Sequence, residues 1–290
     1  MGSFVNRLHD HLTEGSGRSA APVEPLNILV VDDSAIVRQV LTAVLPEKHG
    51  FRVTVAADPL IATQKMKKFQ PDVILLDLEM PHMDGITFLK KLMAENPIPV
   101  VVCSALTGPT TDAAIRALEC GAVDIITKPA MGVRGFLEES ALLLEDTVRA
   151  AASARLRKAS CHPASTLKPT PSKTLALCPV FNTQTDRIIA IGASTGGTEA
   201  LLHVFEQMPR DCPGIVAVQH MPEGFTAAFA RRLNASCEIE VREAVDGDLI
   251  VAGRAYIAPG NHHLLVHRIG GTYSLEVRRG PLVSRHRPSV

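Results

Sequence analysis

The chain has 290 residues, which is room for two domains of ordinary size, and 46% of them are hydrophobic while 21% are charged. Its 30 Lys and Arg residues balance its 30 Asp and Glu residues, which argues against a general nucleic-acid binder. The six cysteines include no C-x-x-C pair and no apolar run is long enough to span a bilayer. We therefore expect reduced thiols and a soluble, cytoplasmic protein.

The first half of the chain alternates short apolar runs with segments of helical spacing. Residues 1–25 come first; they are polar, contain several Gly, Ser and Pro, and predict a disordered tail. Strands are then expected at 27–31, 51–55, 72–76, 98–103 and 123–127, and helices at about 36–45, 59–69, 86–94, 111–120 and within 135–157. Five strands alternating with five helices predict a parallel sheet with helices on both faces.

Polar side chains follow four of these strands at the point where each strand ends. They are Asp32, Asp33, Asp77, Ser104 and Lys128. In an open parallel sheet, ligands bind beyond the carboxyl ends of the strands. Three carboxylates brought together there repel one another unless a cation lies among them, and hard oxygen ligands suit Mg²⁺. The lysine and the serine are groups that could hold a phosphoryl group on a carboxylate.

This set of segments, in this order, resembles the receiver domain of two-component response regulators over residues 26–149, which implies a flavodoxin-like fold. The matching segments are Asp32-Asp33-Ser34, Leu76–Pro81 with Asp84-Gly85, Ser104-Ala105 and Thr127-Lys128-Pro129. The resemblance implies that Asp77 accepts a phosphoryl group from a histidine kinase. It also implies that Asp32, Asp33 and Asp77 hold Mg²⁺ with the carbonyl of Glu79, and that Ser104 and Lys128 bind the phosphoryl oxygens. Ile125 departs from the family, because many receivers have an aromatic switch residue there.

A segment rich in Ala, Ser, Lys and Pro follows at 150–186 and is predicted to be a linker whose first part can still be helical. A second α/β domain is expected over 187–290. Its predicted elements are strands at 188–191 and 214–219, helices at 199–208 and 224–233, short β segments at 238–241 and 255–258, and a hairpin formed by 264–268 and 273–277. These elements predict a parallel sheet with an added β-hairpin.

The turn between the first strand and the first helix of this second domain contains Ser194 in a G-x-S-x-G pattern. That pattern is typical of a nucleophile elbow, in which a tight strand-to-helix turn presents the serine hydroxyl. The next strand ends at His220, and adjacent parallel strands would bring a nucleophile and its general base together. A dinucleotide-binding turn is the competing interpretation. It is disfavoured, because it calls for an acidic residue where His220 stands.

The second half of the chain resembles the family of chemotaxis protein-glutamate methylesterases. The matching segments are Ile191–Gly197, Gln219–Pro222, Ala258–Gly260 with His263, and Arg285–Ser289. The resemblance implies that Ser194 is the nucleophile, His220 is the base and the backbone N–H of Thr195 is an oxyanion donor, with no cofactor in the esterase site. It further implies that methylated chemoreceptors are the substrates, that receptor glutamines are deamidated, and that the receiver obstructs the site until Asp77 is phosphorylated.

The family places the third member of its catalytic triad in a later G-M-G-x-D-G segment, which these 290 residues do not contain. We therefore expect residues 187–290 to be the N-terminal part of a methylesterase domain whose sheet is incomplete. Two hypotheses remain open: a phosphorylation-activated hydrolase, and a catalytically inactive module that binds partners in a phosphorylation-dependent way. A metal site formed by His262, His263, His267 and His286 is disfavoured, because no carboxylate or Cys stands at matching spacing.

Overall fold

The computed structural model describes residues 24–80, 84–105, 108–128, 134–154, 156 and 187–290. Residues 1–23 of the predicted tail and 157–186 of the predicted linker lie outside the described residues. In the described residues, no helix is both long enough and apolar enough to cross a membrane.

The first domain is a five-stranded parallel sheet in the order β2-β1-β3-β4-β5, which is the flavodoxin-like order expected. Its elements are β1 (Leu26–Val31), α1 (Ala35–Val44), the 3₁₀ turn η1 (Glu47–His49), β2 (Phe51–Ala56), α2 (Pro59–Met66), β3 (Val73–Asp77), α3 (Gly85–Glu95), β4 (Val100–Ser104), α4 (Gly108–Glu119), β5 (Asp124–Thr127) and α5 (Arg134–Ala152). Every element predicted for this half of the chain is present, with ends that differ by one to a few residues. The turn η1 was not predicted.

Helices cover both faces of this sheet because its strands are apolar on both sides. One cluster packs α1 and α5 against the sheet, with Leu41 and Val148 among its fully buried members. Helices α2, α3 and α4 pack on the opposite face, where Leu89 and Ala114 are fully buried. Because helices cover both faces of the sheet, a ligand can reach it only at the ends of the strands.

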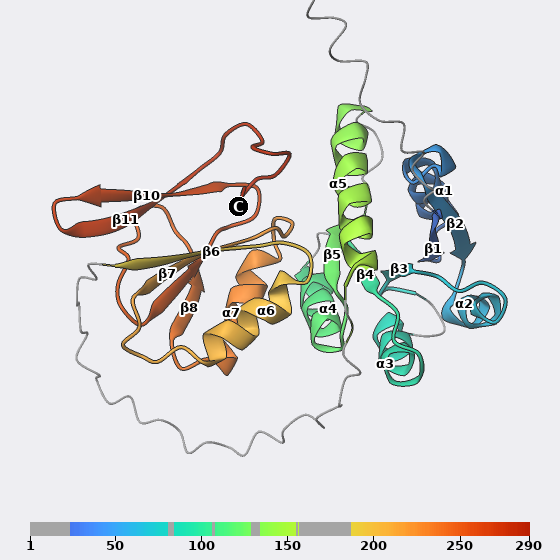
Figure 1. Cartoon of the computed structure of the whole chain (residues 1–290), viewed down its shortest axis with the longest axis horizontal. Helices are drawn as coiled ribbons and strands as arrows, with labels where there is room; N and C mark the ends of the chain where they lie inside the picture. The colour runs from blue at the N-terminus through green and yellow to red at the C-terminus, as the bar shows by residue number, and fades with distance from the viewer. Residues whose placement is uncertain (1–23, 81–83, 106–107, 129–133, 155, 157–186) are drawn as a thin grey trace, which may run out of the picture.

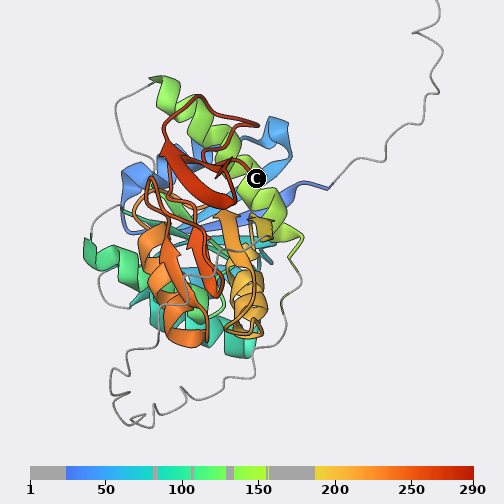
Figure 2. The ribbon, with the colours of Figure 1, turned by 90° about the vertical axis from the view of Figure 1, so that its left-hand side faces the viewer.

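The second domain has a four-stranded parallel sheet in the order β6-β7-β9-β8 and a separate antiparallel hairpin, β10-β11. Its elements are β6 (Ile188–Ala193), α6 (Gly197–Glu206), β7 (Gly214–Gln219), α7 (Thr226–Ser236), β8 (Glu240–Glu243), β9 (Arg254–Ile257), β10 (His263–Ile269) and β11 (Thr272–Arg278). Figures 1 and 2 show α6 and α7 on one side of the sheet and the hairpin on the other. The predicted parallel sheet with an added hairpin is thus confirmed.

The two domains pack directly against each other, with α4, β5 and α5 of the first facing α6, α7 and the segment after β11 of the second (Figure 1). One continuous apolar cluster includes Ile115 and Leu118 of α4 together with Phe229 and Leu233 of α7. Ion pairs lie at its border, such as Arg232 to Glu119 at 3.3 Å. This contact brings the end of one sheet next to the elbow of the other.

Candidate functional sites

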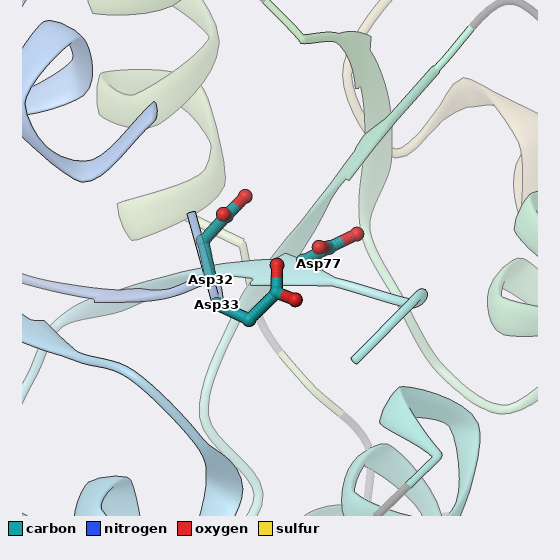
Figure 3. Close-up of side chains that lie close together, drawn as sticks. All are labelled: Asp32, Asp33 and Asp77. Carbon is teal, nitrogen blue, oxygen red and sulfur yellow. The ribbon is translucent and has the colours of Figure 1, made fainter. Parts of the chain in front are cut away.

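The acidic side chains predicted at the strand ends of the first domain lie together (Figure 3). Ligand oxygens of Asp32, Asp33 and Asp77 are all within 4.8 Å of one another, and they are the one group in the described residues that could hold a metal ion. Asp32 and Asp77 are buried, whereas Asp33 is exposed. Parallel pairing explains the arrangement, because β1 and β3 are adjacent and both end at this edge of the sheet.

Lys128 supplies the positive charge of this acidic site. Its Nζ lies 2.6 Å from Asp77 Oδ2 and 3.1 Å from Asp32 Oδ2. Burial lowers the pKa of Lys128, but its hydrogen bond with Asp77 and the charges of Asp77 and Asp32 outweigh that and raise it. Burial raises the pKa of Asp77, and Lys128 opposes that change. Asp32 Oδ2 is buried, and in the described residues its partner is Lys128 Nζ, through an ion pair rather than a hydrogen bond of good geometry.

Ser104 lies at the end of β4, beside β3 on one side and β5 on the other. The neighbouring residue Cys103 pairs with Asp77, and Ser104 itself pairs with Thr127. Its hydroxyl donates to the carbonyl of Ala105 at 3.3 Å. The structure therefore places all five predicted strand-end residues at one edge of the sheet.

The elbow of the second domain presents Ser194 between β6 and α6. Ser194 Oγ lies 3.1 Å from His220 Nδ1, because β6 and β7 pair in parallel with Ala193 opposite Gln219. The turn needs glycine at two positions: Gly196 has φ 77°, and a Cβ on Gly197 would lie 2.3 Å from Gln219 Oε1. Sequence and structure agree on the Ser–His pair, and the geometry is that of a nucleophile beside its general base.

Gln219 is a residue whose role the sequence pattern did not reveal. It is fully buried, and its Nε2 donates to the carbonyls of Ser194 at 3.0 Å and His220 at 3.1 Å. One amide thus fixes the backbone of both the elbow and the loop that carries the imidazole. The available signal was a polar side chain at the end of an otherwise apolar strand.

His220 lies against His286, with ring centroids 3.9 Å apart and nearly parallel planes. Burial, and secondarily His286, lowers the pKa of His220 to about 4. The imidazole is therefore neutral at pH 7 and able to accept a proton. Its Nε2 is buried and has no hydrogen-bond partner among the described residues. Within the described residues, therefore, no acidic side chain fixes the tautomer of His220.

The receiver-like domain contacts the elbow itself. The N–H of Gly196 donates to the carbonyl of Val123 at 3.2 Å. Asp124, at the start of β5, is buried and hydrogen-bonded to the Thr195 side chain; burial raises its pKa to about 6, against the effect of that hydrogen bond. A cavity of about 310 Å³ lies at this junction and is lined by Ser194 and His220 as well as by residues of α1, β5 and α5.

A phosphoacceptor-type acidic site on a flavodoxin-like domain, packed on a serine–histidine elbow, defines a class of protein: a response-regulator hydrolase. Models of two families match the chain, the response regulator receiver domain over residues 28–134 and CheB methylesterase over residues 189–290. The chain belongs to the family of protein-glutamate methylesterases/protein-glutamine glutaminases, the CheB methylesterases. This resolves the choice left open by the sequence in favour of a hydrolase.

Curated relatives match nearly the whole chain. Protein-glutamate methylesterase/protein-glutamine glutaminase 5 of Anaeromyxobacter dehalogenans is 54% identical over 284 residues, which cover 96% of this chain and 77% of that protein. The homologue numbered 2 in Chromobacterium violaceum is 54% identical over 276 residues, covering 91% of this chain and 77% of that protein. The homologue numbered 3 in Geobacter metallireducens is 50% identical over 273 residues, covering 92% and 77%.

Proposed function

We propose that this protein hydrolyses glutamyl methyl esters on chemoreceptors, deamidates receptor glutamines, and is activated by phosphorylation of Asp77 by a histidine kinase. The observation that carries the hydrolytic part is the 3.1 Å contact between Ser194 Oγ and His220 Nδ1 on a strand–turn–helix elbow. The named activity of relatives that are 50–54% identical supports the substrate class.

The reaction runs through an acyl-enzyme. Ser194 Oγ attacks the ester carbonyl carbon while His220 takes its proton, and the backbone N–H of Thr195 donates to the oxyanion that forms. The carbon–oxygen bond to the methoxy group breaks, and the proton on His220 leaves with methanol. Water then attacks the acyl group with His220 as base, which releases the glutamate carboxylate and restores Ser194. With a glutamine side chain, ammonia leaves in place of methanol.

The acidic site of the receiver would hold Mg²⁺ through Asp32, Asp33 and Asp77. Three carboxylates, two of them buried, with ligand oxygens within 4.8 Å of one another fit a hard divalent cation. When bound, the ion neutralises charge on the transferring phosphoryl group. Asp77 accepts that group, and Lys128 and Ser104 bind its oxygens.

Strand β5 connects the phosphoacceptor site to the elbow. Lys128 follows the end of the strand beside Asp77, and Asp124 at its beginning contacts Thr195. The carbonyl of Val123 accepts from the N–H of Gly196, and residues of the receiver line the cavity that contains Ser194 and His220, so the docked receiver narrows access to the elbow. A phosphoryl group at Asp77 competes for Lys128 and Ser104 and shifts β5, which weakens this docking and admits the substrate. The shift needs no rotating aromatic ring, since Ile125 occupies that position and is buried.

The direct test is release of methanol from methylated receptors, and of ammonia from receptors with glutamine at the same sites, by the purified chain with Mg²⁺ and a small phosphodonor. We expect both products, with more of each in the presence of the phosphodonor. Binding to receptors without release of either product would overturn the proposal and favour a phosphorylation-dependent binding module.

A further inference from the structure

A two-residue turn after β11 carries Arg285 to the edge of the catalytic cavity. Val283 and His286 close the turn with two backbone hydrogen bonds, of 3.1 and 2.9 Å. Ser284 and Arg285 between them have φ of 49° and 66°. Positive φ at both central positions defines a type I′ turn, in which Gly is favoured at the second position.

An arginine at that position is conformationally unfavourable, because its Cβ crowds the backbone at positive φ. Backbone strain of this kind persists only where the surrounding structure enforces it, and it clusters at active sites and ligand-binding segments. The turn is anchored from behind: Arg287 donates to Asn261 Oδ1 at 2.8 Å from Nε and 2.5 Å from Nη2, and to the Gly280 carbonyl at 2.5 Å from Nη1. The guanidinium of Arg287 is thus fully engaged in holding the loop.

Arg285 has a different environment. It lines the same cavity as Ser194 and His220, and its side chain is 60% exposed. Its Nη1 lies 3.1 Å from Asp146 Oδ2 on α5, so its ion-pair partner belongs to the receiver domain that packs beside the site. Besides Arg285 and Arg287, the catalytic domain contributes the charged side chain of Glu223 to the described lining of this cavity. Glu223 accepts a hydrogen bond from Asn261 Nδ2 at 2.7 Å. When the receiver moves away, Arg285 loses its carboxylate.

We infer that Arg285 is a substrate-binding residue that receives an acidic side chain next to the scissile ester, and that Asp146 occupies this subsite in the docked state. The inference rests on the proposed function. Each reaction cycle of that function converts an ester or an amide into a carboxylate, so a substrate segment with several sites becomes acidic as it is processed. A guanidinium at the cavity edge pairs with such carboxylates in a charge-assisted, bidentate manner. The receiver thereby presents to Arg285 the chemical group that the substrate presents.

The probe is a pair of receptor-type helical peptides, each with one glutamyl methyl ester. The neighbouring acidic positions are all Glu in one peptide and all Ala in the other, which avoids glutamines that the enzyme would itself convert. With Mg²⁺ and phosphodonor, we expect the full chain to show a KM about tenfold lower for the Glu-flanked peptide and a similar kcat for both. Arg285→Gly and Arg285→Gln should remove this preference, so that each variant has the same KM for the Glu-flanked and the Ala-flanked peptide.

Two controls separate binding from structure. Arg285→Gly suits the turn better than Arg, so its melting temperature should equal or exceed that of the parent chain. Arg231→Gln removes another interdomain ion pair, with Asp112 at 3.9 Å, but Arg231 does not line the cavity, so the preference should persist. A Glu preference that survives in both Arg285 variants, or is absent in the parent chain, would overturn the inference. Failure of both peptides to give Ser194-dependent methanol would overturn the proposed function instead.

Discussion

The two sites of this molecule stand at equivalent places and are built on opposite electrostatic principles. Both lie where parallel strands end, and in both the decisive pair comes from adjacent strands, β1 with β3 and β6 with β7. The receiver site gathers like charges that a cation and a lysine must balance. The elbow gathers neutral groups, a hydroxyl and an imidazole whose pKa is lowered to about 4. The first is suited to bind and hold a phosphoryl group, and the second to move a proton.

The largest effect is expected from removing the nucleophile. Ser194→Ala should lower kcat for methanol release by about 10⁴-fold or more, since the Ser–His pair acts as a unit. Thermal unfolding should be unchanged, because the hydroxyl is exposed and its hydrogen bond is to His220. Ser236→Ala, an exposed serine at the end of α7, is the matched control. Equal activity in Ser194→Ala and the parent chain would remove the elbow from the mechanism.

The acidic site should control the elbow only through phosphorylation. Asp77→Asn should abolish stimulation by a phosphodonor, which we expect to be about tenfold in the parent chain, within the usual range of coupling between sites. Unstimulated activity should remain. Glu95→Gln, which neutralises an exposed carboxylate at the last residue of α3 and outside the acidic site, should keep the stimulation. Methanol release with and without phosphodonor distinguishes the two variants, and stimulation of Asp77→Asn would contradict the role of Asp77.

Reversing a charge at the interface between the two domains should weaken their docking. Glu119→Lys replaces the partner of Arg232 with a like charge and should raise unphosphorylated activity about two- to fivefold, as expected for an interaction at a partly exposed border. Unstimulated methanol release is the measurement. Glu95→Lys makes the same change of charge outside the interface and should have no effect. A Glu119→Lys variant that is no more active than the parent would show that docking does not limit the reaction.

The smallest effect concerns the protonation of the base. His220 accepts protons only when neutral, so kcat/KM should fall as pH drops toward its lowered pKa of about 4. Because burial and His286 both lower this pKa, His286→Gln should move the acidic limb to higher pH by less than about one unit. The same shift means that the unfolded chain binds more protons than the folded chain between about pH 4 and 6.5, so stability is lost on acidification through that range. An unmoved limb would assign it to another group.

Much of the first site was predictable because every contributing residue stands at the end of a strand, in sequence order. Apolar β-branched runs mark where β1, β3, β4 and β5 stop, and parallel pairing then brings their polar successors together. The Ser194–His220 contact followed from the same rule, whereas the flavodoxin-like strand order was implied by the resemblance to receiver domains. Element ends were less certain, because the last residues of a helix such as α5 carry no cap signal in the sequence.

The contacts between domains could not be predicted in the same way. Thr195 meets Asp124, and Arg285 meets Asp146, only because two sheets pack with a particular relative orientation, which no local pattern specifies. Some contacts within a domain could not be predicted either. The position of Gln219 on β7 was clear from the sequence, but its hydrogen bonds to two backbone carbonyls are seen only in the structure.

The central claim is that Ser194 is a nucleophile whose reactivity toward substrates is controlled from Asp77. An active-site-directed fluorophosphonate, followed by peptide mass spectrometry, tests both parts in one measurement. The labelled residue should be Ser194, labelling should be several-fold faster with Mg²⁺ and a phosphodonor, and Asp77→Asn should react only at the slower rate. Labelling at another residue, or a rate at Ser194 that phosphodonor does not change, would contradict this account.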